Sequence, residues 1–189
     1  MAANIGGGVV FGGLYTATQR TDWAGITGLK ENATSGNYDG ALVFNTRTTA
    51  SGWSEAMRIT STSCVGIGTT APDEQLHLFS SASCEPVIKI EGTSTNASYA
   101  GILEFYKNTS AGSIADYDGT GQVAFFGNND AGTPEKIKYS SIDTWLSDYT
   151  DGTEDGTMDF VTMMAGTERS KIRLEPTETV FNEGSVDID

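Results

Sequence analysis

The chain alternates apolar and polar residues in short runs that are separated by turn-forming residues. One pattern, Gly-x-aliphatic-x-Phe with Met counted as aliphatic, occurs at 7–11, 40–44, 101–105, 121–125 and 156–160. Alternate residues of a strand share one face, so the aliphatic residue and the Phe point to the same side. The residue between them is Glu104 or Asp159 in two of the copies. The pattern predicts half-buried strands whose opposite face is solvated.

Helical spacing of apolar residues is weak throughout the chain. The best candidate is 70–76, with Thr70 as a cap and Pro72 near the first turn. A turn that leads into a strand explains these residues equally well. We therefore predict an all-β protein of repeated antiparallel β-meander or sandwich units, in an elongated assembly.

Residues 7–60 and 121–175 align with an offset of 114–116 residues, which indicates an internal repeat. Each copy is predicted to form a four-stranded antiparallel meander. A third, shorter copy is expected to begin with a strand at 87–90. The predicted divisions are a β unit at 1–62, a connector at 63–86, a short β unit at 87–116, a second β unit at 117–178 and the start of a further unit or tail at 179–189. The aligned positions pair Gly7 with Gly121, Phe11 with Phe125, Trp23 with Tyr139, Ile26 with Ile142, Gly40 with Gly156, Thr46 with Thr162, Met57 with Ile172 and Arg58 with Arg173.

Composition changes this picture mainly through charge. The 189 residues include 11 Lys and Arg against 25 Asp and Glu, a formal net charge of -14. Phosphate backbones repel such a chain, so nucleic acid is not an expected partner. No apolar run approaches the ~18 residues of a membrane span, and the first residues do not resemble a secretory signal. With 23 Gly, a core shared between chains is easier to build than one round core.

The most distinctive stretch lies at the end of the first repeat and continues beyond it. It closely resembles the connector of bacteriophage tail-fibre and related virion appendage proteins, and most of the chain resembles units of such fibres. The residues that carry the resemblance are Glu55, Met57, Arg58, Ile59, Val65, Gly66, Ile67, Gly68, Thr69, Pro72, Leu76 and His77.

The resemblance implies a homotrimeric fibre on the virion surface. It suggests inter-subunit contacts at the connector residues Val65, Gly66, Ile67, Gly68, Pro72 and His77. In such a trimer the two aliphatic residues would point to the axis and the glycines would face neighbours. One departure is Ser63-Cys64, where the family usually has Gly and a polar residue.

Candidate metal ligands occur in two acidic turns. Asp116 and Asp118 form a D-x-D-G string, and Asp151, Glu154 and Asp155 form the second turn. Such strings suit Ca²⁺, but the distal Glu and flanking helices of an EF-hand are missing. Solvated hairpin loops are the preferred interpretation, and no cofactor is expected.

Other reactive or adhesive residues are few. His77 is interpreted as structural, with a shared metal at a trimer axis as the alternative, and Cys64 and Cys84 as free thiols. Trp53, Trp145 and Tyr149 flank polar loops and are candidates for stacking on a receptor or host-surface glycan. Asn-x-Ser/Thr sequons occur at Asn32, Asn96 and Asn108.

No Gly-x-Ser-x-Gly, P-loop or paired-carboxylate signature is present, so an enzyme is not predicted. The expected function is a structural segment of a phage tail fibre or similar extracellular appendage, a stiff shaft or knob that presents a receptor-binding region. Its expected partners are further copies of itself and other tail or appendage proteins. Two alternatives remain open: a glycan- or receptor-binding module, and a subunit of an extracellular filament that assembles head to tail.

Overall fold

The computed structural model describes residues 2–50, 52–95, 99, 101–110 and 112–181. Contacts within the chain define two compact units, Met1–Lys89 and Ile90–Asp189. The described residues form strands and turns without a helix, which confirms the all-β prediction. This part of the chain accordingly offers no helical candidate for a membrane span.

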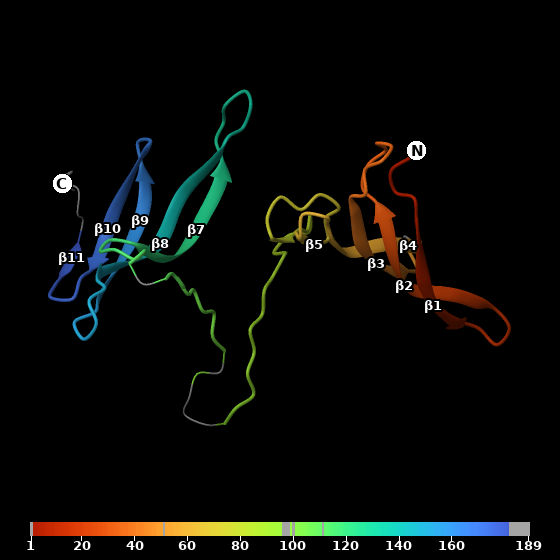
Figure 1. The fold of residues 1–189 in the computed structure, drawn as a ribbon, viewed down its shortest axis with the longest axis horizontal. Coiled ribbons are helices and arrows are strands. Elements are labelled where there is room, and N and C mark those ends of the chain that lie inside the picture. Colours follow the sequence, from red (N-terminus) through yellow and green to blue (C-terminus); the bar gives the residue numbers. More distant parts are fainter. Residues whose placement is uncertain (1, 51, 96–98, 100, 111, 182–189) are drawn as a thin grey trace. The chain divides into compact units, whose positions relative to one another are not determined.

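The first unit holds one six-stranded sheet, in which the strands follow the order of the chain (Figure 1). Its first four strands form an antiparallel meander, and the short β5 and β6 extend it as a parallel pair. The strands are β1 (Gly6–Leu14), β2 (Arg20–Lys30), β3 (Gly40–Thr48), β4 (Gly52–Ile59), β5 (Val65–Ile67) and β6 (Leu76–Leu78).

The second unit holds a five-stranded antiparallel sheet of the order β11-β10-β9-β8-β7. Residues 179–181 therefore belong to this sheet, and 182–189 lie outside the described residues. The strands are β7 (Gly119–Asn128), β8 (Lys136–Asp148), β9 (Asp155–Met164), β10 (Thr167–Leu174) and β11 (Thr179–Phe181).

Aligned positions of the two repeats occupy equivalent places in the two meanders. Val9, Ile26, Phe44 and Met57 are direct cross-strand partners in the first sheet. Val123, Ile142, Phe160 and Ile172 are partners in the second. The ladder also shifts register at matching points, after Phe11 and after Phe125. Each unit is a single sheet over its described residues, so the meander forms and the sandwich within one unit does not.

The connector folds back on its own unit instead of linking two separate bodies. The N–H of Val65 donates to Gln75 O, that of Gly68 to Ala56 O and that of Phe79 to Ile67 O, at 2.8, 3.1 and 2.9 Å. Residues 70–76 are non-helical and lead into β6, as the turn interpretation predicted. Ser63 takes a left-handed conformation with φ of 66°, a backbone position that favours Gly.

The segment between β6 and β7 differs from expectation. A strand was predicted at 87–90 and another at 101–105, but the described residues of 79–118 contain none. A strand needs a partner for its N–H and C=O groups, and neither sheet edge provides one here. The alternating apolar residues of this segment lie outside both sheets.

The buried interior of each unit is small. Among the described residues the buried apolar side chains are Ala41 and Val43 in the first unit and Val161 in the second. Ser141, Asp143 and Asp159 are equally buried. All six lie on one face of their sheets, and that face is not the one that carries most apolar side chains.

Gly68 is where the connector depends most on a missing side chain. Its φ is +77°, and an added Cβ would lie 2.2 Å from Phe79 O. We expect Gly68→Ala to lower the free energy of unfolding by about 2–4 kcal/mol, because it adds left-handed strain to a clash with backbone. Urea denaturation measures this change. Gly132→Ala is the matched control, since nothing lies within 4 Å of its Cβ position; equal midpoints for the two variants would contradict the role of Gly68.

Candidate functional site

One face of the first sheet is almost wholly apolar. The cross-strand row that begins at Val9 continues through both connector strands to Leu78. A second row on the same face, two residues along each strand, adds four more aliphatic side chains. We call this set the apolar face of unit 1; it comprises Val9, Ile26, Leu42, Phe44, Met57, Ile59, Val65, Ile67, Leu76 and Leu78.

The second sheet repeats this arrangement. Its row runs from Val123 to Phe181, and the neighbouring row contributes Met158 and Leu174. The apolar face of unit 2 comprises Val123, Ile142, Met158, Phe160, Ile172, Leu174 and Phe181. The five-residue pattern in the sequence located only two strands of each face; the others become visible through the register.

Both apolar faces are open in the single chain. Val9 is 62% exposed, Leu42 41% and Phe160 36%. Burial of apolar area is worth roughly 25 cal/mol per Å², so leaving these side chains in water forgoes a large part of the free energy a sheet can gain. An exposed apolar patch of this extent is typical of a surface that another molecule covers.

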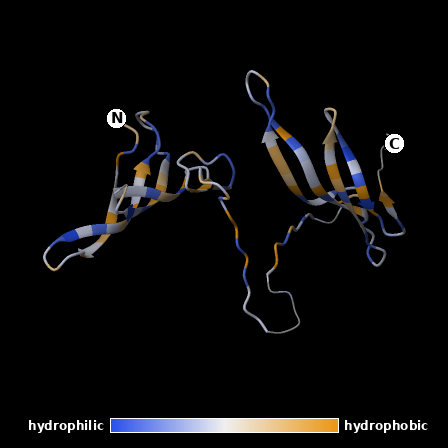
Figure 2. Cartoon of the chain, turned by 180° about the vertical axis from the view of Figure 1, so that it is seen from behind, coloured by the Kyte–Doolittle hydropathy of each residue, from blue (hydrophilic) through white to orange (hydrophobic). Residues whose placement is uncertain are grey.

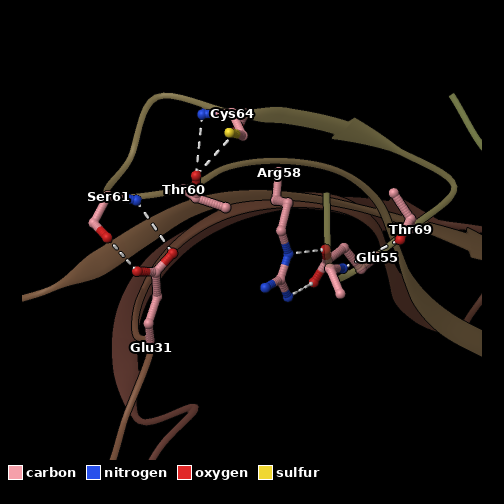
Figure 3. A network of polar contacts seen from close by, with 8 residues as sticks. Glu31, Glu55, Arg58, Thr60, Ser61, Cys64 and Thr69 are labelled. Atoms are coloured by element: carbon pink, nitrogen blue, oxygen red, sulfur yellow. Dashed lines mark hydrogen bonds and ion pairs between the residues drawn. The ribbon is translucent and has the colours of Figure 1, made fainter. Parts of the chain in front are cut away.

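The opposite face of unit 1 is polar and carries an ion pair. Arg58 donates from Nε and Nη2 to the two carboxylate oxygens of Glu55, at 2.6 and 2.8 Å (Figure 3). The side chains are only 14% and 16% exposed. The hydrogen bond that Arg58 donates to Glu55 raises the pKa of Arg58, so the guanidinium stays charged. Beside it, the backbone N–H and hydroxyl of Ser61 both donate to Glu31.

The polar face of unit 2 holds the equivalent arginine with a different carboxylate. Arg173 donates to both oxygens of Asp159, at 2.7 and 2.9 Å, and Ser170 donates to the same carboxylate at 3.3 Å. Asp159 is 5% exposed, which corrects the expectation that it is solvated. Asp159 occupies the register position of Val43 in unit 1, and Glu55 occupies that of Ser170. The two repeats therefore keep the arginine and move the acid.

The segment between the sheets is a third exposed apolar region. Val87, Ile88, Ile102, Leu103 and Phe105 are all more than half exposed. Figure 2 shows hydrophobic stretches along the chain that joins the two sheets. Glu104 is exposed, as predicted. This alternation is the composition of a strand, although the described residues form none here.

The connector residues divide between these surfaces. Val65 and Ile67 lie on the apolar face of unit 1, while Gly66 and His77 lie opposite. Gly66 and Gly68 face their own chain: added Cβ atoms would meet Thr69 O at 2.8 Å and Phe79 O at 2.2 Å, and Pro72 lies beside Gly66.

His77 and the two cysteines make local contacts. His77 Nδ1 lies 2.7 Å from Asp73 Oδ1, and its ring meets Phe79 edge to face. Cys64 is half-buried and Cys84 exposed, both as free thiols.

The acidic turns are ordered by local hydrogen bonds. Asp118 accepts from Lys107 Nζ at 2.7 Å and from Ala115 N–H, and Asp116 accepts from Tyr149 N–H. Asp151, Glu154 and Asp155 lie on the hairpin after β8. Over the described part of the chain no three His, Cys, Asp or Glu side chains converge as metal ligands do. Asn96 lies outside the described residues.

The aromatic candidates belong to two different units. Trp53 belongs to unit 1, where its ring covers Gly25. Trp145 belongs to unit 2 and lines a cavity of about 270 Å³ with Tyr117 and Arg173, and Tyr149 follows on the next hairpin. Each of these rings is between a third and a half exposed, so neither unit holds them in its interior.

Comparison with known proteins agrees with this architecture. The chain resembles the carboxy-terminal domain of the bacteriophage T5 L-shaped tail fibre, with a TM-score of 0.69 and 12% identity over 100% of this chain and 83% of that one. A second structure of that domain, with its intramolecular chaperone domain, gives 0.72 and 11% over 99% and 57%. No family model and no curated protein matches. The likeness shows a fold shared with tail-fibre domains.

Exchange of the acid between the repeats gives a test of the buried ion pair. Asp159→Val leaves Arg173 without its bidentate partner, so we expect a loss of about 2–4 kcal/mol in the free energy of unfolding. Adding Ser170→Glu rebuilds the pairing of unit 1, three residues before the arginine, and should restore most of that loss. Thermal and urea denaturation measure both variants. The interpretation is wrong if Asp159→Val alone is as stable as the unmodified chain. It is also wrong if adding Ser170→Glu restores none of the lost free energy of unfolding.

Acid should weaken unit 2 through two aspartates. The hydrogen bond from Lys107, and then that from Ala115 N–H, lower the pKa of Asp118; the Thr150 N–H lowers the pKa of Asp148. Groups with a depressed folded pKa stabilise above the unfolded value, ~3.9, and lose that contribution as pH falls through the folded value. The urea midpoint should therefore fall below about pH 4, and less so in Asp118→Asn/Asp148→Asn. If the urea midpoint of Asp118→Asn/Asp148→Asn falls with pH as steeply as that of the exposed-loop control Asp130→Asn, this assignment is wrong.

Proposed function

We propose that this chain is a non-catalytic structural segment of a phage tail fibre or a similar extracellular appendage, exposed on the virion surface. Its work is mechanical: it forms a stiff shaft or knob that presents a receptor-binding region and assembles with other fibre components. The fold shared with tail-fibre domains supports this role. The observation that carries it is the pair of open apolar faces at equivalent register in both units.

The occupant we propose for these faces is a further copy of the chain, in a homotrimer. The described chain exposes 13930 Å². Two separate compact units of half the mass would expose about 10,500 Å² together. The excess of about 3,400 Å² exceeds the roughly 1,600 Å² that a chain loses through two standard interfaces. Three chains with their apolar faces toward a common axis would share the cores that each one lacks.

The segment between the sheets supports the same assembly. Its exposed apolar side chains offer surface that a neighbouring copy can cover. In this proposal Val87, Ile88, Ile102 and Leu103 add to the contact between subunits. Val65 and Ile67 contribute to the subunit contact, whereas Gly66, Gly68, Pro72 and His77 position the connector within its own chain.

The oligomeric state tests the proposal. Light scattering on the full chain should give a concentration-independent mass of about 60 kDa, three chains of 20.0 kDa. Val9→Asp/Val123→Asp places two carboxylates on the apolar faces at exposed positions, so it should dissociate the trimer without unfolding the sheets. Circular dichroism checks the folded state.

Tyr38→Asp is the control, because Tyr38 is 97% exposed and lies in the loop before β3. A monomer of the unmodified chain would overturn the proposal. A mass that grows with concentration would favour the alternative of a head-to-tail filament, because a heterologous contact that does not close makes open polymers. A trimer that survives both charges would place its interface elsewhere.

A further inference from the structure

A cavity of about 520 Å³ opens at one end of the first sheet, between the β1–β2 and β3–β4 hairpins. It belongs to unit 1 alone, and its size lies within the range of small-ligand sites, roughly 300–1,000 Å³. The side chains that line it and could engage a ligand are Tyr15, Arg20, Trp23, Arg47, Thr48 and Thr49.

The aromatic wall is held in place by local structure. Trp23 lies against Gly13, where an added Cβ would come within 2.7 Å of its ring. The N–H of Tyr15 donates to Gln19 O at 3.0 Å, and its hydroxyl donates to the Gln19 side chain. Both rings remain about half exposed. They form a pre-positioned apolar surface with polar edges, which suits the alternating C–H and O–H groups of a sugar ring.

The charge of the cavity is opposite to that of the chain. Its described lining residues include two guanidinium groups and no carboxylate, in a protein of net charge -14. Arg58 and Arg173 are held by carboxylates, but neither Arg20 nor Arg47 makes an ion pair with the described residues. Arginine is the side chain that recognises carboxylate and phosphate with two parallel hydrogen bonds.

The cavity lies at the border of the two faces: the Trp23 ring meets Gly13, which follows Val9 and Phe11 on β1, whereas Arg47 lies away from the proposed subunit contact. Arg47 lies on the same face of β3 as Val43 and Asn45, because it follows them at even spacing. That is the polar face. Covering the apolar face with another copy therefore leaves Arg47 accessible.

From these observations we propose that the cavity binds an anionic saccharide, that is, a sugar unit carrying a carboxylate or a phosphate. The guanidinium groups of Arg20 and Arg47 take the anionic group, Trp23 and Tyr15 stack on the sugar ring, and the threonines are placed to meet its hydroxyls. This inference goes beyond the structural role and gives unit 1 an adhesive function of its own.

Titration of intrinsic tryptophan fluorescence on the full chain tests the proposal. The probes are oligogalacturonate and its methyl ester, which has the same rings without charge. Glucose 6-phosphate, glucose and inorganic phosphate distinguish a phosphosugar from a free anion. The carboxylate sugar or the phosphosugar should bind, at least about tenfold more tightly than its neutral analogue, with an affinity that falls as salt increases.

Variants locate the site. Measured by isothermal titration calorimetry, because removing Trp23 also removes the fluorescent reporter, Arg20→Gln/Arg47→Gln should weaken binding by about tenfold or more and Trp23→Ala should abolish it. Lys136→Gln, an exposed charge change in unit 2, should leave it unchanged. Val9→Asp/Val123→Asp should still bind, so failure of the trimer and failure of this site are distinguishable. If a variant does not fold, the affinities of the unmodified chain for oligogalacturonate and for its methyl ester still test the proposal. Four results would overturn the proposal. Two concern the probes: equal affinity for acid and ester, or binding of inorganic phosphate alone. The others are no binding of any probe and full affinity in the arginine variant.

Discussion

A single-layer sheet has two faces, and strand geometry sends every second side chain to each. In both units most apolar side chains are gathered on one face, and the other face carries the polar side chains together with a few small buried apolar ones. Within one unit no second layer of described residues covers the apolar face. The size of the buried core and the way the chain can gain hydrophobic free energy both depend on this. It explains why the buried apolar core of the described residues is limited to Ala41, Val43 and Val161. Such a chain gains most of its hydrophobic free energy only when another surface meets it.

The polar face shows how each unit is held together before any such contact. Its bidentate arginine pairs are shielded and hydrogen-bonded through both carboxylate oxygens, which is the condition under which a buried charge is tolerated. The two repeats reach that condition differently, with the acid on the same strand as Arg58 and on the strand next to Arg173. Both positions of the acid lie on the polar face, so either one satisfies the arginine without disturbing the apolar side.

The connector illustrates a different division of work. Its aliphatic residues lie on the apolar face, and its glycines let the chain turn tightly against Thr69 and Phe79. The aliphatic positions of the connector therefore serve packing between surfaces, and its glycine positions let the chain fold back on itself. A glycine-rich string of this kind is informative because each glycine has a separate steric reason.

The sequence alone determined the all-β class, the strands of the two meanders and the equivalence of their positions, because period-two alternation and turn residues are local properties. It also placed Val65 and Ile67 on one face. Tertiary structure decided the rest. The strands predicted at 87–90 and 101–105 did not form, since a strand exists only with a partner. Asp159 became buried, since Arg173 lies on the neighbouring strand, 14 residues away. Arg20 and Arg47, 27 positions apart in the sequence, were brought to one cavity by hairpins whose register no local pattern encodes.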